Sequence, residues 1–191
     1  MIILGIDPGL ATMGFGVLQK DTKGMITPLD YGVVLTKKED PLPKRLQAIE
    51  QGMYQLIEKY NPDEVALEEL FFTKNITTGI SVAEARGVIL LASENKGKPL
   101  FEYTPMQIKQ AITGYGKAEK KQVQQVVATL LKLKKIPRPD DAADALGIAL
   151  CHAYTNRFTE LYRVQNMTRT KGKNAVSGVQ AKEALKEKGE I

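Results

Sequence analysis

The stretch Met1-Ile2-Ile3-Leu4-Gly5-Ile6-Asp7-Pro8-Gly9 (residues 1–9) decides how the rest of the chain is interpreted. Residues 1–6 are apolar and partly β-branched, which predicts a buried strand. Asp7 ends this strand, where a buried carboxylate must be paired, hydrogen-bonded or bound to a metal ion. An aspartate before Pro-Gly can equally be an ordinary turn residue. The stretch by itself leaves both interpretations of Asp7 open.

The segments after this stretch predict a sheet with helices on it. Residues 14–18 and 31–36 are expected to be strands, and the short turn at 21–24 favours an antiparallel meander. Apolar residues at alternating spacings of four and three predict a helix from about 40 to 60. The remaining elements are expected as strands over 65–71 and 100–103 and helices over 81–95, 104–112, 118–133 and 140–156. This order predicts an α/β fold, a mixed β-sheet flanked by α-helices.

A second acidic position follows the apolar residues Val65-Ala66-Leu67, where the chain reads Glu68-Glu69. Side chains alternate along a strand, so these two glutamates are expected to point to opposite faces. Periodicity does not decide between them, because a central strand is buried on both sides. A solvated strand end would also explain both.

Three aspartates begin the last helix, in Pro139-Asp140-Asp141-Ala142-Ala143-Asp144. Asp140 needs no function, because an acidic residue stabilises a helix start. Asp141 and Asp144 are three residues apart and share one helix face. This face continues to the apolar Ile148, so Asp144 is expected to be partly buried and to need a partner. No lysine or arginine lies between Pro139 and Asn156, so we expect that partner to be a cation.

The types of residue in the chain limit the metal. A single cysteine (Cys151) excludes a four-cysteine zinc site, and a single histidine (His152) excludes motifs with two histidines. We expect both residues to be structural. Carboxylate oxygens without such ligands favour Mg²⁺ or Mn²⁺. Two such ions can activate a water molecule and stabilise the leaving oxygen in phosphodiester hydrolysis.

Charge is distributed unevenly along the chain, although the whole carries only +5. Residues 1–95 have 9 basic and 13 acidic residues, a net charge of −4, whereas residues 96–138 have 10 and 2, a net charge of +8. This pattern favours a polyanion that the basic segment holds and the carboxylates cleave. Lysine-rich helix faces that are merely solvated would give the same count.

The chain divides at about residue 162. Large apolar residues become rare after this point, so we expect a nuclease domain over 1–162 and a flexible basic tail over 163–191. No apolar run approaches the roughly 20 residues of a membrane helix. The first residues lack the basic flank of a signal peptide, which favours a cytoplasmic protein.

Five motifs together resemble the RuvC family of Holliday-junction resolvases over roughly residues 1–156. They are Ile3-Leu4-Gly5-Ile6-Asp7-Pro8-Gly9, Ala66-Leu67-Glu68-Glu69-Leu70-Phe71, Ala85-Arg86-Gly87-Val88, the stretch with Phe101-Glu102-Tyr103, Lys109-Gln110 and Ala118-Glu119-Lys120, and Asp141-Ala142-Ala143-Asp144-Ala145-Leu146. The resemblance implies a ribonuclease H-like fold and a homodimer that nicks a four-way DNA junction symmetrically with Mg²⁺. Two ions per site are expected, with Mn²⁺ as a substitute. It also implies a branch-migration motor complex (RuvA and RuvB) as partner.

The resemblance also assigns residues. It implies that the catalytic, metal-binding carboxylates are Asp7, Glu68, Asp141 and Asp144. It implies that a phenylalanine contacts the junction, and this role falls on Phe71, with Phe72 as a close competitor. Two DNA-contacting lysines of the family match Lys109 and Lys120. We expect the DNA-binding residues to be Phe71, Phe72, Lys74, Lys109, Lys117 and Lys120.

Three other functions are considered. A strand ending in Gly-Ile-Asp also opens the actin-like sugar kinases and chaperone ATPases, but those need a second phosphate-binding lobe and a much longer chain. A related nuclease of the same fold processes ribosomal RNA precursors, yet it lacks the phenylalanine-containing loop. A non-catalytic junction-binding module would not need all four carboxylates.

Overall fold

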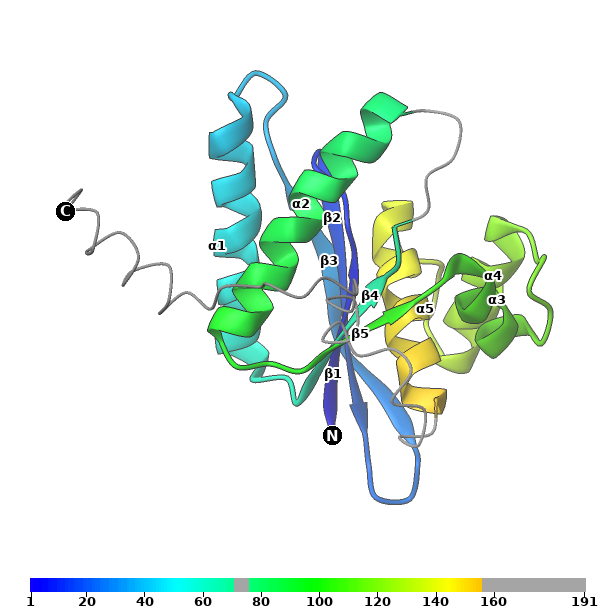
Figure 1. Ribbon diagram of the computed structural model, residues 1–191. Coiled ribbons are helices and arrows are strands. Elements are labelled where there is room, and N and C mark those ends of the chain that lie inside the picture. The colour runs from blue at the N-terminus through cyan, green and yellow to red at the C-terminus, as the bar shows by residue number, and fades with distance from the viewer. Residues whose placement is uncertain (71–75, 156–191) are drawn as a thin grey trace, which may run out of the picture.

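The computed structural model describes residues 1–70 and 76–155 and contains a five-stranded mixed sheet with the order β3-β2-β1-β4-β5 (Figure 1). β1, β2 and β3 form the expected antiparallel meander, whereas β4 is parallel to β1 and β5 is parallel to β4. The strands are β1 (Ile2–Asp7), β2 (Thr12–Lys20), β3 (Ile26–Leu35), β4 (Glu64–Glu68) and β5 (Leu100–Tyr103).

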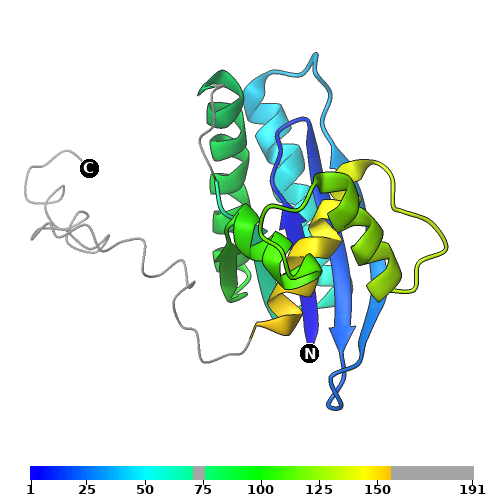
Figure 2. The same ribbon diagram turned by 90° about the vertical axis from the view of Figure 1, so that its right-hand side faces the viewer.

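Helices cover both faces of this sheet, so the predicted α/β fold with a mixed, helix-flanked sheet is confirmed. α1 (Leu42–Tyr60) and α2 (Ile76–Asn95) pack on one face. The other face carries α3 (Pro105–Thr113), α4 (Lys120–Leu130) and α5 (Asp140–Tyr154). Figure 2 looks at this second face, where α5 crosses in front of the strands and α3 and α4 lie outside it. No helix in the described part of the chain is long and apolar enough to span a membrane.

Local sequence explains where several elements begin and end. Thr104 caps α3 as expected, because its side chain accepts a hydrogen bond from the Gln107 amide while the Gln107 side chain reaches back to the cap. Gly114 ends α3 with φ 74°, a conformation that suits glycine. β4 was predicted to continue to Phe71 but ends at Glu68, because apolar composition alone could not show where pairing with β1 and β5 stops.

Glycines allow α5 to approach the sheet unusually closely. A Cβ atom on Gly5 of β1 would lie 2.8 Å from the Ala149 Cβ, and one on Gly16 of β2 would lie 2.8 Å from the Leu146 amide nitrogen. Both distances are shorter than any real contact, so the helix backbone can rest on these strands only where side chains are missing. The close approach brings the first turns of α5 to the same end of the sheet as Asp7, because a Cβ on Gly14, the strand partner of Asp7, would meet Asp141.

Candidate active site

Asp7 and Glu68 lie at the same edge of the sheet. Each is the last residue of its strand, and the strands are parallel neighbours in which Ile6 is paired with Leu67. The residues that follow this pair therefore emerge side by side. Glu68 and Glu69 were expected to be neighbours on one strand that point to opposite faces, but β4 ends at Glu68 and Glu69 lies beyond it. The Glu69 backbone amide donates a 2.8 Å hydrogen bond to the Tyr103 carbonyl.

The start of α5 adds two more carboxylates to this edge. Asp141 and Asp144 lie in its first turns, and the negative charge of each acts to raise the pKa of Asp7. Asp140 is not the helix cap: Pro139 occupies that position, and the Asp140 carboxylate forms an ion pair with Arg138. Asp140 therefore lies in the first turn of α5 rather than at its cap, and Arg138 gives it a local partner.

The four carboxylates repel one another. Burial, and after it the charges of Glu68, Asp144 and Asp141, raises the pKa of Asp7 well above its usual value of 3.8. Burial and then the charge of Asp144 also raise the pKa of Glu68 above 4.5. Such mutual repulsion among partly buried groups means that this edge of the sheet favours bound cations.

Asp144 is held by α4 through both of its oxygens. The Lys120 Nζ lies 2.6 Å from Oδ2, and the Gln124 Nε2 donates a 3.3 Å hydrogen bond to Oδ1. A partner for Asp144 was expected to be a bound cation, because no lysine lies nearby in α5; in the structure a lysine of a different helix, α4, is in contact with it. Gln124 was not identified from the sequence. The available signal was its position four residues after Lys120, which places both on one face of α4.

The donor set fits hard divalent cations. All four side chains offer carboxylate oxygens, the ligands that Mg²⁺ and Mn²⁺ prefer, and a bound cation would relieve the repulsion that raises the pKa values of Asp7 and Glu68. Across residues 1–70 and 76–155, however, no three acidic, histidine or cysteine side chains already surround a common point. The four carboxylates lie at one edge of the sheet, and the Asp144 carboxylate faces Lys120.

The expected DNA-binding residues fall in two groups. Lys109 lies in α3, Lys117 precedes α4 and Lys120 begins α4. The positive charges of Lys120 and Lys109 both act to lower the pKa of Glu68, so these two lysines lie near the carboxylates. Phe71, Phe72 and Lys74 lie outside the described residues.

His152 and Cys151 are structural, as expected. The His152 Nε2 lies 2.7 Å from the Glu64 carboxylate, and its Nδ1 lies 2.6 Å from the Tyr103 hydroxyl. A carboxylate only accepts hydrogen bonds, so Nε2 donates to Glu64, and in the neutral imidazole Nδ1 then accepts from the Tyr103 hydroxyl. Burial raises the pKa of the Cys151 thiol to about 12, which keeps it unreactive.

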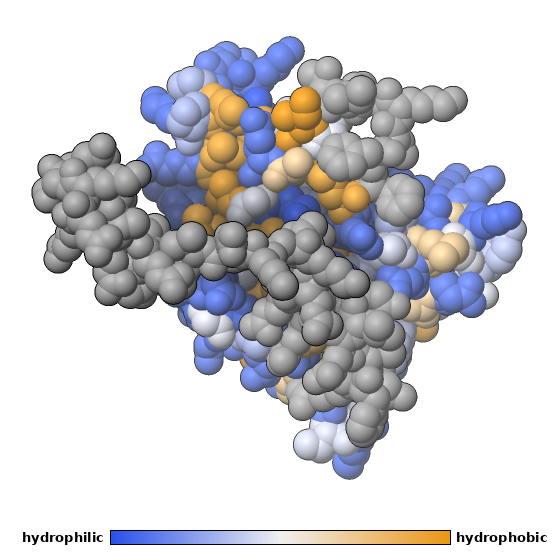
Figure 3. Space-filling view, in the orientation of Figure 1, coloured by the Kyte–Doolittle hydropathy of each residue, from blue (hydrophilic) through white to orange (hydrophobic). Residues whose placement is uncertain are grey.

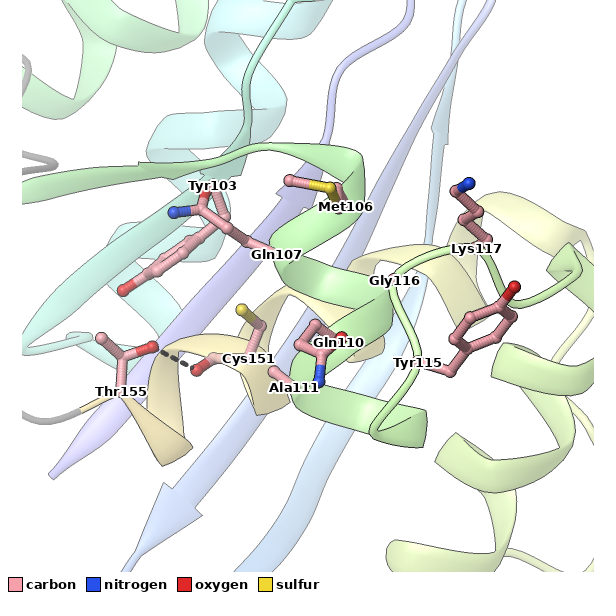
Figure 4. Close-up of a pocket in the computed structure, with 10 residues that line it drawn as sticks. All are labelled: Tyr103, Met106, Gln107, Gln110, Ala111, Tyr115, Gly116, Lys117, Cys151 and Thr155. Carbon is pink, nitrogen blue, oxygen red and sulfur yellow. Dashed lines mark hydrogen bonds between the residues drawn. The ribbon is translucent and has the colours of Figure 1, made fainter.

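A cavity of about 640 Å³ lies beside α3 and the end of α5. In Figure 4, Tyr103 and Thr155 lie at the left of the cavity, Met106 and Gln110 of α3 near its middle, and the Tyr115 ring with Lys117 at its right. None of the four carboxylates lines it. The cavity is therefore separate from the acidic edge of the sheet.

Comparison with known proteins gives consistent matches over most of the chain. A family model described as crossover junction endodeoxyribonuclease RuvC matches residues 3–152. A protein of that name from Petrotoga mobilis is 58% identical over 158 residues, which are 82% of this chain and 96% of the relative. One from Brevibacillus brevis is 53% identical over 161 residues, 84% of this chain and 96% of the relative. A structure of Thermus thermophilus RuvC in complex with a Holliday junction substrate is similar with a TM-score of 0.79 and 36% identity, and the match covers 85% of this chain and 98% of that one.

Proposed function

The chain belongs to the RuvC family of crossover junction endodeoxyribonucleases, whose ribonuclease H-like fold it has, and we propose that it resolves four-way DNA junctions by paired symmetric nicks. The observation that carries this proposal is the convergence of Asp7, Glu68, Asp141 and Asp144 at one edge of the sheet. Cleavage of this kind would serve homologous recombination and DNA repair.

The four carboxylates are the residues that would hold metal. Bound divalent cations, Mg²⁺ in our proposal and two per site, would activate a water molecule and stabilise the leaving oxygen of the phosphodiester. Asp7 and Glu68 are suited to this because their positions are fixed by paired strands rather than by loops. Asp141 and Asp144 are held in position by α5, which packs closely on the sheet because β1 and β2 have glycines at the contact.

The lysines of the basic segment would hold the junction. Lys109 of α3 and Lys120 of α4 lie near the carboxylates, where phosphates of a bound strand could be neutralised, and Lys117 precedes α4 in the same basic segment. Phe71, Phe72 and Lys74 follow Glu68 in the chain. A phenylalanine there could stack on an unpaired base at the branch point, and such stacking contributes about 1–3 kcal/mol.

Paired nicks need two active sites, which favours a homodimer. Helix α2 has apolar side chains in solvent, with Ile80 52% and Leu91 57% exposed. Figure 3 shows apolar surface gathered over α1 and α2. A second copy that covers this surface would bury it and place a second site on the other strand of the junction. We also propose a branch-migration motor complex, RuvA and RuvB, as the partner that delivers junctions.

The alternatives have weaker support. The relatives compared above carry the name of a junction endodeoxyribonuclease, which does not favour a ribosomal RNA processing nuclease. A non-catalytic junction-binding module would have no reason to keep four mutually repelling carboxylates together.

The experiment that tests the proposal compares substrates for the full chain with and without Mg²⁺. A four-way junction, a linear duplex of the same sequence, a single-stranded RNA and ATP are offered in parallel. We expect metal-dependent, symmetric nicking of the junction and little reaction with the other three. Equal cleavage of duplex and junction, or preferred cleavage of the RNA, would contradict the proposal.

A further inference from the structure

Helix α4 holds the Asp144 carboxylate with two very different residues. Lys120 is a cation whose side chain is 59% exposed, and it lies 2.6 Å from Oδ2. Gln124 is neutral, only 4% exposed, and donates to Oδ1 at 3.3 Å. The two residues are one helical turn apart, so α4 presents them to the two oxygens of a single carboxylate.

The ion pair conflicts with both roles that the proposed function gives these residues. Asp144 cannot offer Oδ2 to a divalent cation while an ammonium group occupies that position, because the two positive charges repel each other. Lys120 likewise cannot neutralise a phosphate while it is paired with Asp144. One rearrangement resolves both conflicts, since the lysine can leave the carboxylate when a metal ion arrives.

We propose that Lys120 holds the place of a divalent cation on Asp144 until metal and junction bind, and that Gln124 is the positioning residue that keeps Asp144 aimed at the site during this exchange. The inference rests on the proposed function. It adds that the lysine is a placeholder for metal as well as a phosphate contact, and it assigns a role to Gln124.

The burial of the two residues fits these separate roles. Lys120 is exposed and begins the helix, so its side chain can swing toward solvent and a bound phosphate without disturbing the core. Gln124 lies in the buried face of α4, between Val123 and Val127, and cannot move in this way. A carboxylate has about four sites that accept hydrogen bonds or metal, so Oδ1 can keep the amide while Oδ2 exchanges its cation.

The exchange couples the two ligands. A junction phosphate that attracts Lys120 empties Oδ2 and favours metal, and a metal ion that displaces Lys120 releases it for the phosphate. By thermodynamic linkage each ligand then raises the affinity for the other by the same factor. Lys120 also offsets part of the repulsion among the carboxylates before metal arrives. Its positive charge acts against the rise in the pKa values of Asp7 and Glu68.

The first test measures binding of Mg²⁺ and Mn²⁺ to the metal-free full chain by calorimetry, without DNA. Lys120→Met keeps the length of the side chain and removes its charge. We expect it to bind metal at least about fivefold more tightly than the wild type, within the usual range of coupling between sites. Lys121→Met, the exposed neighbour on α4, is the matched control and should leave metal affinity unchanged. Equal or weaker metal binding by Lys120→Met than by Lys121→Met would overturn the exchange.

The second test concerns Gln124. Gln124→Met should weaken metal binding and lower kcat on the junction by about tenfold, while KM changes little, and the exposed Gln125→Met should change none of these. Unchanged metal affinity in a folded Gln124→Met protein would overturn the positioning role. If the wild type bound no metal or cut no junction, the proposed function itself would fail. A wild type that does both, with unaltered variants, would refute only the exchange.

Discussion

The two ends of α5 carry ionisable groups in opposite surroundings, with partly buried carboxylates at its start and the buried His152 at its end. At its start, Asp141 and Asp144 join Asp7 and Glu68 in a cluster of like charges that repel one another. At its end, His152 lies between the Tyr103 hydroxyl and the Glu64 carboxylate, each within 2.7 Å of a ring nitrogen. The acidic cluster needs charge from outside, whereas the histidine cluster completes its hydrogen bonds internally.

Structural and functional residues of the same type occur at the two ends of α5. β4 contributes a glutamate to both clusters, with Glu64 at its first residue and Glu68 at its last. Composition therefore does not distinguish the two ends. What distinguishes them is the presence of complementary neighbours. A polar group whose hydrogen bonds are completed within the core stabilises the fold. An ionisable group whose neighbours carry the same charge marks a site for a ligand.

The largest expected effect is on catalysis at the acidic end. Asp7→Asn, Asp141→Asn and Asp144→Asn each remove one metal-binding charge and keep the volume of the side chain. We expect each to lower the cleavage rate at least about 10³-fold, equivalent to about 4 kcal/mol of activation free energy. Junction binding, measured by electrophoretic mobility shift, should be at least as tight, because less negative charge faces the phosphates. A variant that keeps normal turnover would remove its residue from the site.

The next effect is on stability at the histidine end. His152→Ala leaves the Tyr103 hydroxyl and the Glu64 carboxylate buried without this partner and opens a cavity beside Phe101, whose ring centroid lies 4.8 Å from that of His152. We expect a loss of about 3 kcal/mol in the free energy of unfolding, measured by urea titration. Metal affinity of the folded protein should not change. If His152→Ala altered metal binding without loss of stability, the contrast between the two ends would be wrong.

A smaller effect is the pH dependence of stability that the acidic end of α5 contributes. Folding raises the pKa values of Asp7 and Glu68 above 3.8 and 4.5, so their contribution to stability is fully present below those values and is lost as the pH rises through the raised pKa values. The metal-free protein should therefore lose part of its stability in that window. Asp7→Asn should flatten the profile, and so should added Mg²⁺. Denaturant titrations of the metal-free wild type and of Asp7→Asn across this range provide the check.

The smallest effect concerns the lysine on α3. Lys109→Ala should weaken junction binding and reduce the slope of log K against log salt by about one unit, because one phosphate contact is lost. An unchanged slope would mean that Lys109 only solvates the helix. Lys134→Ala, in the same basic segment but beyond α4, serves as the comparison.

Periodicity predicted most of the helices and strands, but it left the choice between Glu68 and Glu69 open and did not reveal the partners of the acidic residues. Helix and strand periodicity located α1 and β5 because each has one apolar face or an apolar run with clear boundaries. The contact of Lys120 with Asp144 could not be predicted from the sequence, because it joins two helices, and sequence periodicity does not show which helices pack against each other. The same holds for His152, whose two partners come from β4 and β5. Gln124 carried only a weak signal, its spacing from Lys120.

The most direct test compares the two adjacent glutamates at the end of β4. Glu68 ends the strand beside Asp7, whereas Glu69 lies beyond it. Glu68→Gln and Glu69→Gln make the same chemical change one residue apart, and both are assayed for Mg²⁺-dependent nicking of a four-way junction under single-turnover conditions. We predict that Glu68→Gln loses cleavage while it still binds the junction, and that Glu69→Gln keeps most of its activity. Normal cleavage by Glu68→Gln would contradict the claim that the carboxylates at this edge of the sheet carry out the reaction.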